Sequence, residues 1–197
     1  MTNAKKLLAL IPTIILFLIY GSLHSGCNSV DEAYLTRVDT LDQMLESNEK
    51  YLLIDYKTID QRKNLIFTHM SLVKRFYDKT MSEEFGNSMA RYKGIYKQYN
   101  NFVNQYPGLS DELNELKHQA ATLRESVQKK ELSKEEFKQY YQKEKLDIKN
   151  NLAASEVLSQ NIHGLEPDYQ RISALIDSEL VRIAQKNEDL KAILEAK

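Results

Sequence analysis

The sequence of 197 residues contains one cysteine, three prolines, six glycines and no tryptophan. A single cysteine excludes an internal disulfide framework. So few glycines and prolines argue against a sandwich or barrel of many strands, because such folds need a turn signal about every 8–12 residues. The 27 lysines and arginines nearly balance the 28 aspartates and glutamates. This excludes the strongly basic charge of a general nucleic-acid binder, so no nucleic-acid partner is expected.

The motifs of common catalytic and cofactor sites are also missing. The sequence has no glycine-rich phosphate loop, no G-x-S-x-G turn and no H-E-x-x-H pair. His69, His118 and His163 are scattered over separate predicted helices, so no metal site is expected. Acidic pairs open three predicted helices, at Glu83–Glu84, Asp111–Glu112 and Glu135–Glu136. The helix dipole explains acids there without catalysis. The sequence therefore predicts a protein without enzymatic activity, metal or cofactor.

The first 27 residues have the layout of a secretion signal. Two lysines precede residues 7–20, an apolar run of about 14 residues, which is shorter than the roughly 20 that span a bilayer. Small and polar residues then lead to Ser25, Gly26 and Cys27. The residues alone fit a lipoprotein signal, an ordinary secretory signal with an incidental cysteine, or an uncleaved anchor.

This arrangement resembles the signal peptide of bacterial lipoproteins. In that class a lipobox of Leu, two small residues and Cys directs a diacylglycerol group to the Cys sulfur. Ser25, Gly26 and Cys27 match the last three positions, and His24 stands where Leu is usual. The resemblance implies that residues 1–26 are a cleaved signal, that Cys27 is the lipid attachment site, and that the mature protein is membrane-anchored in the cell envelope. Asn28, rather than Asp, follows the cysteine and favours the outer membrane by the sorting rule of that class.

Residues 27–197 are predicted to form a single all-α domain. Residues 28–85 and 109–163 contain neither glycine nor proline and are rich in helix-forming residues. Five helices are expected, over 31–79, 82–105, 110–130, 134–162 and 167–195. Because short connections make consecutive helices neighbours, we expect an elongated antiparallel bundle that resembles a coiled coil.

The expected helix ends depend on a few local signals. Pro107 and Gly108 predict a tight corner, and Ser110 after them is a candidate N-cap. Ser133 and Glu136 have the spacing of a capping box. Gly164 and Pro167 predict a further break between two helices.

Residues 31–79 allow two registers of the inward-facing stripe. The stripe begins with Tyr34, Val38, Leu41 and Leu45. Continuing it by three residues brings in the polar residues Asn48, Asp55, Arg62 and His69. Continuing it by four gives mostly apolar residues, and this second register is the favoured one. The change of phase at 46–50 fits either a stutter in one continuous helix, which we prefer, or a turn capped by Ser47 or Asn48.

An aromatic run is the candidate partner-binding feature. It consists of Tyr92, Tyr96, Tyr99, Phe102 and Tyr106. An exposed strip of such rings could stack on a glycan or a peptide, whereas the alternation of spacings of three and four is typical of a buried seam. We expect the first three tyrosines to be core and Phe102 to lie to one side. The lysines and acids between 129 and 149, Glu144 among them, are predicted to form a solvated, charge-balanced face.

The leading functional hypothesis is a non-enzymatic, lipid-anchored envelope protein whose helical bundle holds or spaces a protein partner. One alternative is a glycan- or peptidoglycan-binding lipoprotein that uses the tyrosine-rich helix face. Another is an extracytoplasmic chaperone-like coiled coil.

Overall fold

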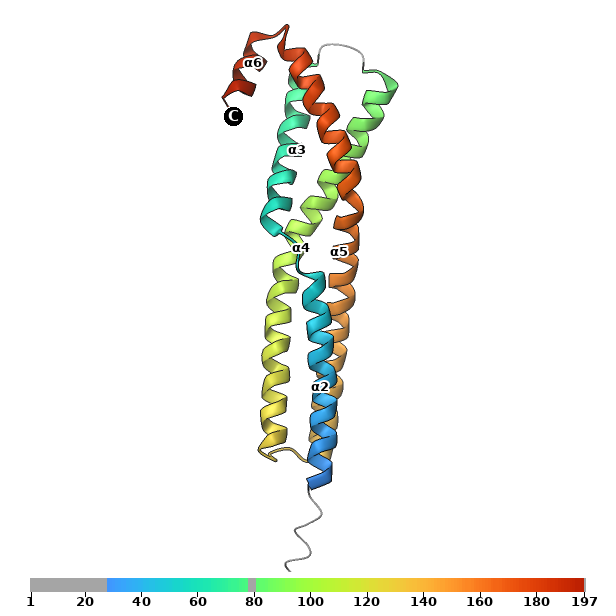
Figure 1. Cartoon of the computed structure of the whole chain (residues 1–197), viewed down its shortest axis with the longest axis vertical. Helices are drawn as coiled ribbons and strands as arrows, with labels where there is room; N and C mark the ends of the chain where they lie inside the picture. The colour runs from blue at the N-terminus through green and yellow to red at the C-terminus, as the bar shows by residue number, and fades with distance from the viewer. Residues whose placement is uncertain (1–27, 78–80, 197) are drawn as a thin grey trace, which may run out of the picture. The chain divides into compact units, whose positions relative to one another are not determined.

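A computed structural model describes residues 28–77 and 81–196, with side chains from residue 32 onward. The described residues form helices and contain no strand, which confirms the all-α prediction (Figure 1). The helices are α2 (Asn28–Tyr51), α3 (Tyr56–Phe76), α4 (Glu83–Gln128), α5 (Lys134–Ala184) and α6 (Glu188–Glu195). Within this part of the chain, none of the helices is both long and apolar enough to cross a membrane. The expected signal peptide and Cys27 lie outside the described residues.

The contacts of the chain group into two compact units. Unit 1 contains the described residues up to Gln43 and Lys117–Leu146, and unit 2 contains Met44–Leu116 and the described residues from Asp147 onward. In unit 1, Tyr34 stacks on Phe137 with ring centroids 4.0 Å apart, and the Thr40 and Tyr141 hydroxyls are 3.2 Å apart. Residue numbers rise together along both helices, so α2 and α5 run parallel here.

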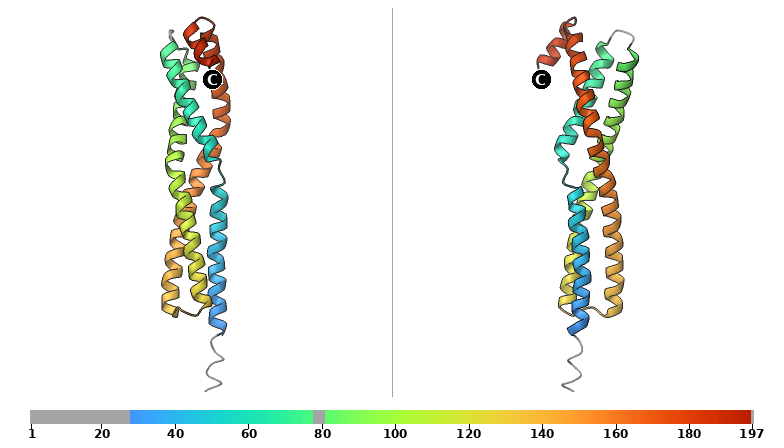
Figure 2. Two further views of the ribbon diagram at one scale, coloured as in Figure 1. Left: turned by 90° about the vertical axis from the view of Figure 1, so that its left-hand side faces the viewer. Right: turned by 45° about the vertical axis from the view of Figure 1, so that its right-hand side comes forward.

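We call the segment formed by α2 and α3 the first leg of the bundle. In unit 2, α3 of this leg runs parallel to α5, as α2 does in unit 1. Tyr56 contacts Tyr106 and Tyr77 stacks on Phe85, so residue numbers rise along α3 as they fall along α4. Arg62 of α3 pairs with Glu166 of α5, again in the parallel direction. Helices in up-down-up order therefore form the bundle of this unit, with α4 antiparallel to its two neighbours (Figures 1 and 2).

The expected corner at Pro107 and Gly108 is wrong, because α4 continues through both residues. Its inward stripe keeps strict spacings of three and four across the proline: Tyr99, Phe102, Tyr106, Leu109, Leu113, Leu116. A proline inside a helix costs about 3 kcal/mol. Each fully buried leucine stabilises the fold by about 1.5–3 kcal/mol, so keeping the stripe in phase outweighs that cost. Ser110 is consequently no cap, and the Asp111–Glu112 pair lies in mid-helix rather than in a first turn.

The break expected around Gly164 and Pro167 is wrong for the same reason. Helix α5 runs through both residues, and Ile162, Leu165 and Tyr169 keep the stripe in phase across them. The chain breaks instead after Ala184, where Asn187 caps α6 through its side chain. The capping box at Ser133 is confirmed: its hydroxyl receives a hydrogen bond from the Glu136 backbone, and the Glu136 carboxylate accepts from the Ser133 backbone.

The first leg is two helices, and the preferred continuous helix over 31–79 is wrong. Asp55 caps α3, with its carboxylate accepting hydrogen bonds from the backbone and hydroxyl of Thr58 at 3.1 and 2.6 Å. The Leu52 carbonyl, left free at the end of α2, accepts a 2.8 Å bond from the Tyr106 hydroxyl. The turn thus lies at the Asp55 cap rather than at Ser47 or Asn48, and no glycine or proline marks it.

Candidate functional site

The inward stripe of the first leg combines both registers. Leu52, Ile59, Ile66 and Val73 of the favoured apolar register are buried, while Asp55 of the polar register is exposed. Asn48 and His69 are buried and Arg62 is half-buried. Each of them meets a polar side chain of α5 within unit 2. We call this set the polar ladder: Asn48–Asn151, Arg62–Glu166 and His69–Asp177. Polar residues occupy a seam at low cost only when they are paired, and these pairs explain how Asn48, Arg62 and His69 are accommodated beside the apolar residues.

The first pair of the ladder is a network of amides. Asn48 Nδ2 donates to Asn151 Oδ1 over 2.6 Å, and both residues are almost fully buried. Asn151 Nδ2 in turn donates to the Glu112 carboxylate at 2.6 Å and to the Leu109 carbonyl at 3.3 Å. Asn151 therefore joins α2, α4 and α5, and an axial shift of either neighbour would leave buried amides unpaired.

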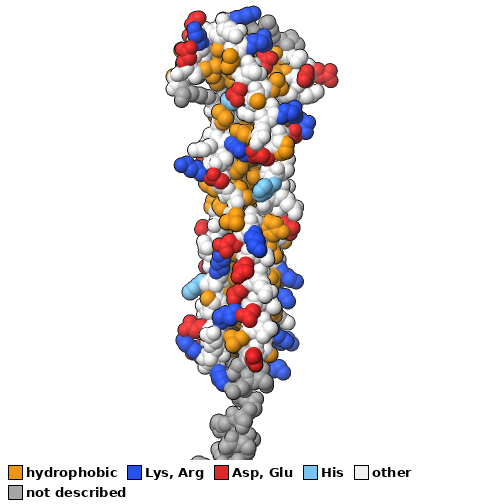
Figure 3. Space-filling model, in the orientation of Figure 1, with side chains coloured by type: hydrophobic (Ala, Val, Ile, Leu, Met, Phe, Trp, Pro, Cys, Tyr) orange, Lys and Arg blue, Asp and Glu red, His pale blue; other side chains and the backbone are white. Residues whose placement is uncertain are grey.

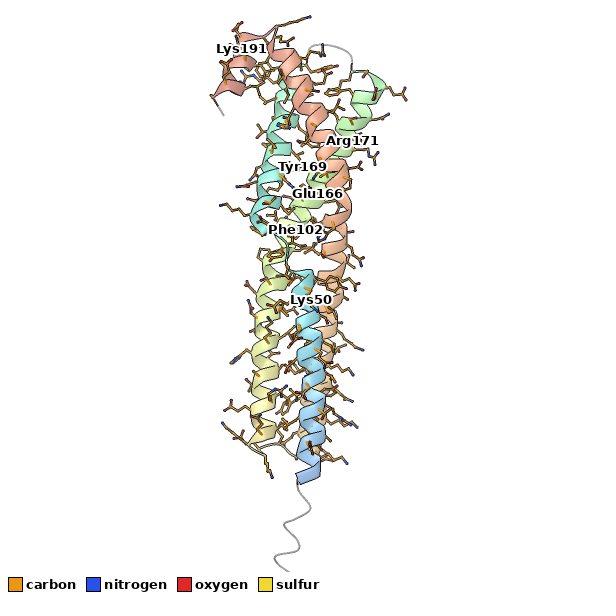
Figure 4. All side chains as sticks on the ribbon, viewed as in Figure 1. Lys50, Phe102, Glu166, Tyr169, Arg171 and Lys191 are labelled. Carbon is orange, nitrogen blue, oxygen red and sulfur yellow. The ribbon has the colours of Figure 1, made fainter. Side chains whose placement is uncertain are left out.

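The second pair lies beside aromatic rings. Arg62 donates to the Glu166 carboxylate, and its guanidinium carbon lies 4.8 Å from the centre of the Tyr169 ring. Burial acts to raise the pKa of Glu166, but the hydrogen bonds from Arg62 and Gln170 and the charge of Arg62 together hold this pKa below its usual value. Figure 4 shows Glu166 and Tyr169 on α5 and Phe102 on α4 in this region.

The third pair adds a tyrosine from α4. His69 Nε2 is 3.1 Å from an Asp177 carboxylate oxygen, and His69 Nδ1 is 3.1 Å from the Tyr92 hydroxyl. That hydroxyl also lies 3.3 Å from Ser173 Oγ. Burial raises the pKa of Tyr92 to about 12 and does the same for Tyr99. The Tyr92 phenol and the His69 imidazole thus connect three helices, which is a structural role.

The five candidate partner-binding aromatics divide into two groups. Tyr92, Tyr99 and Phe102 are fully buried, whereas Tyr96 and Tyr106 are half-buried. The core placement is right for Tyr92 and Tyr99, but Phe102 does not lie to one side. The inward stripe of α4 contains Ile95 and Phe102, which are buried. The residues that follow each of them, Tyr96 and Val103, are only half-buried. A broad aromatic strip for stacking a glycan is therefore not presented by this helix.

One exposed aromatic pair remains on unit 2. Phe67 of α3 is 58% exposed, and its ring centroid lies 6.2 Å from that of the half-buried Tyr96 of α4. Sequence analysis missed Phe67 because neither register of the stripe includes it. Elsewhere the face seen in Figure 3 mixes acidic and basic side chains with hydrophobic ones. The pair offers stacking area to a partner that a charged surface would not.

The predicted charge-balanced face between 129 and 149 includes one error. Glu144 is buried on the inward stripe of α5, between Phe137 and Ile148. Glu131, Glu135 and Glu136 are exposed as expected, and Asp147 is half-buried. Glu83–Glu84 and Glu135–Glu136 lie in first helical turns, as predicted.

Over the described part of the chain, no group of three or more histidine, cysteine, aspartate or glutamate side chains is placed to hold a metal ion. Comparisons with protein families, with curated proteins and with solved structures found no significant match.

Proposed function

We propose that this chain is a non-enzymatic, lipid-anchored protein of the cell envelope whose helical bundle holds or spaces a protein partner. The observation that carries the binding part is the exposed Phe67 ring beside Tyr96. Aromatic rings of this kind are enriched at the centres of protein interfaces. The polar ladder supports the scaffold part, since it gives the bundle one defined register.

The anchoring part rests on the sequence. The apolar run at 7–20 and the Ser25–Gly26–Cys27 end support lipid attachment at Cys27, with the outer membrane favoured by Asn28. Two or more acyl chains on one cysteine suffice for stable anchoring, whereas a single chain is marginal. Cys27→Ser should release the protein from membranes or leave a precursor of higher mass. Unchanged mass and membrane partition in this variant would contradict the proposal.

Partner binding is tested by capture from an envelope extract with residues 28–197 as bait. The informative variant is Phe67→Ser, and Val157→Ser is the matched control because Val157 is also 58% exposed. We expect one stoichiometric protein to be lost with Phe67→Ser and kept with Val157→Ser. Retention on purified peptidoglycan alone would favour the glycan-binding alternative. Capture of many unfolded envelope proteins would favour the chaperone-like one.

A further inference from the structure

A cavity of about 350 Å³ opens in unit 1 between α4 and α5. Its lining residues are Gln119, Thr122, Leu123, Ser126, Leu132, Tyr140 and Glu144. The volume lies within the range of small-molecule sites, and the walls are mostly apolar with a few polar groups, as such sites require.

Glu144 is the unusual member of this lining. Its side chain is nine-tenths buried, and one carboxylate oxygen, Oε2, is buried with no hydrogen-bond partner. The other oxygen, Oε1, is 3.5 Å from the ammonium of the exposed Lys143, which is beyond good hydrogen-bond distance. The Glu144 carboxylate therefore has one long ion pair, to Lys143, and one buried oxygen with no donor. A buried carboxylate oxygen normally accepts a hydrogen bond, so Oε2 points to a donor group on a bound molecule.

The stripe position of Glu144 strengthens this argument. Phe137 and Ile148 occupy the equivalent inward positions on either side and are fully buried. An apolar residue would pack there without burying a charge, and a solvent-exposed acid would lie elsewhere on the helix. Residues that weaken the fold without local compensation are typical of binding sites.

From this geometry we propose that the cavity binds a small organic ammonium ion with an apolar body. The ammonium group pairs with the Glu144 carboxylate, whose terminal torsion is broad enough to turn either oxygen toward the cavity. The half-exposed Tyr140 ring provides a face for the cation, and Leu123 and Leu132 contact the apolar body. The carboxylate repels anions, and a neutral analogue brings no positive charge to it. The proposal is independent of the proposed partner surface, which lies in unit 2.

The test uses the full chain in uncharged maltoside micelles and para-fluorobenzylamine as the probe, followed by fluorine NMR. We expect saturable binding of this amine, at least about tenfold weaker binding of para-fluorobenzyl alcohol, and a similar loss with Glu144→Gln. Glu135→Gln removes an exposed acid of the same helix and should leave binding unchanged. Ser126→Phe fills the cavity and should abolish binding while Glu144 is kept.

Thermal melting separates binding from folding in these variants, since Glu144→Gln removes a buried charge whose ion pair with Lys143 is long, and this variant should melt no lower than the native chain. Absence of saturable amine binding to the native chain would overturn the proposal. Equal binding of the alcohol, or of the amine to Glu144→Gln, would overturn it as well. Self-association that Ser126→Phe disrupts, seen by sedimentation without amine binding, would assign the cavity to a second copy of the chain instead.

Discussion

Asn48 and Asn151 share a hydrogen bond of 2.6 Å between two buried side chains, one from the first leg of the bundle and one from α5. Both residues stand at positions where a leucine would bury more apolar area. A buried asparagine in a seam fixes the axial register of helices at a cost in stability, because any other register leaves its amide unpaired. The Asn48–Asn151 hydrogen bond therefore favours one axial alignment of α2 and α5 over all others.

Replacing Asn48 by alanine should lower the free energy of unfolding by about 1–3 kcal/mol, because Asn151 Oδ1 loses its donor from α2 in a buried site. Urea denaturation measures this. Glu46→Ala, an exposed change on the same helix, should stay within about 0.5 kcal/mol of the native chain. The double variant Asn48→Leu/Asn151→Leu should lose less than the sum of its two single variants, since neither amide is then left alone. Strict additivity would argue against the pairing.

Stability should fall as the pH rises above about 10. Burial raises the pKa of Tyr92 to about 12 in the folded chain, and an unfolded tyrosine loses its proton near pH 10. Between these values the unfolded state binds fewer protons than the folded state, so the slope of the unfolding free energy against pH is negative. Each such tyrosine contributes up to about 1.4 kcal/mol per pH unit.

The variant Tyr92→Phe isolates one of these protons. Urea denaturation between pH 9 and about 11.5 should show an alkaline slope that is shallower by one proton than that of the native chain. Tyr140→Phe changes an exposed ring and should leave the slope as it is. An unaltered slope in Tyr92→Phe would show that this phenol does not stay protonated in the folded chain.

Phe102→Ala should destabilise the protein more than Tyr96→Ala does. Phe102 is fully buried, and removing such a ring costs about 3–5 kcal/mol, whereas Tyr96 is only half-buried. Thermal or urea unfolding of the two variants decides the order. The reverse order would place Tyr96 on the inward stripe and shift the whole of this α4 segment by one residue.

Gly94→Ala should raise the free energy of unfolding by about 0.5–1 kcal/mol. Gly94 is an exposed residue inside α4, and a Cβ built there meets nothing within 4 Å. Alanine restricts the unfolded chain more than glycine does and suits the helix better. Calorimetry measures the gain. A loss of stability would reveal a close helix approach at Gly94.

The sequence was sufficient to predict the all-α class and the Ser133–Glu136 capping box, because both depend on local propensities and spacings. It was misleading at Pro107 and Gly164, where residues that usually end a helix lie inside one. At these positions the local preference to end the helix is worth a few kcal/mol. The burial of apolar side chains, whose spacing stays in phase on both sides, outweighs it.

The candidate sites were harder to predict than the fold. Asn48, Arg62 and His69 were placed outside the seam because they are polar, yet their partners on α5 lie more than a hundred residues further along the chain. No local pattern reveals such pairing. Glu144 was assigned to a solvated face for the same reason, since it stands in a stretch of alternating lysines and acids of which most are exposed.

The break between α2 and α3 makes α2 separable from the rest of the chain. Leu53 in the break is 77% exposed, and each helix is finished there by its own contacts, from Tyr106 at Leu52 and from Asp55 at Thr58. A protease that cleaves beside Leu53 would leave both helix ends intact and the Asn48–Asn151 bond in place. The severed α2 would then be a peptide ligand of α5, and the protein could be reassembled from two fragments.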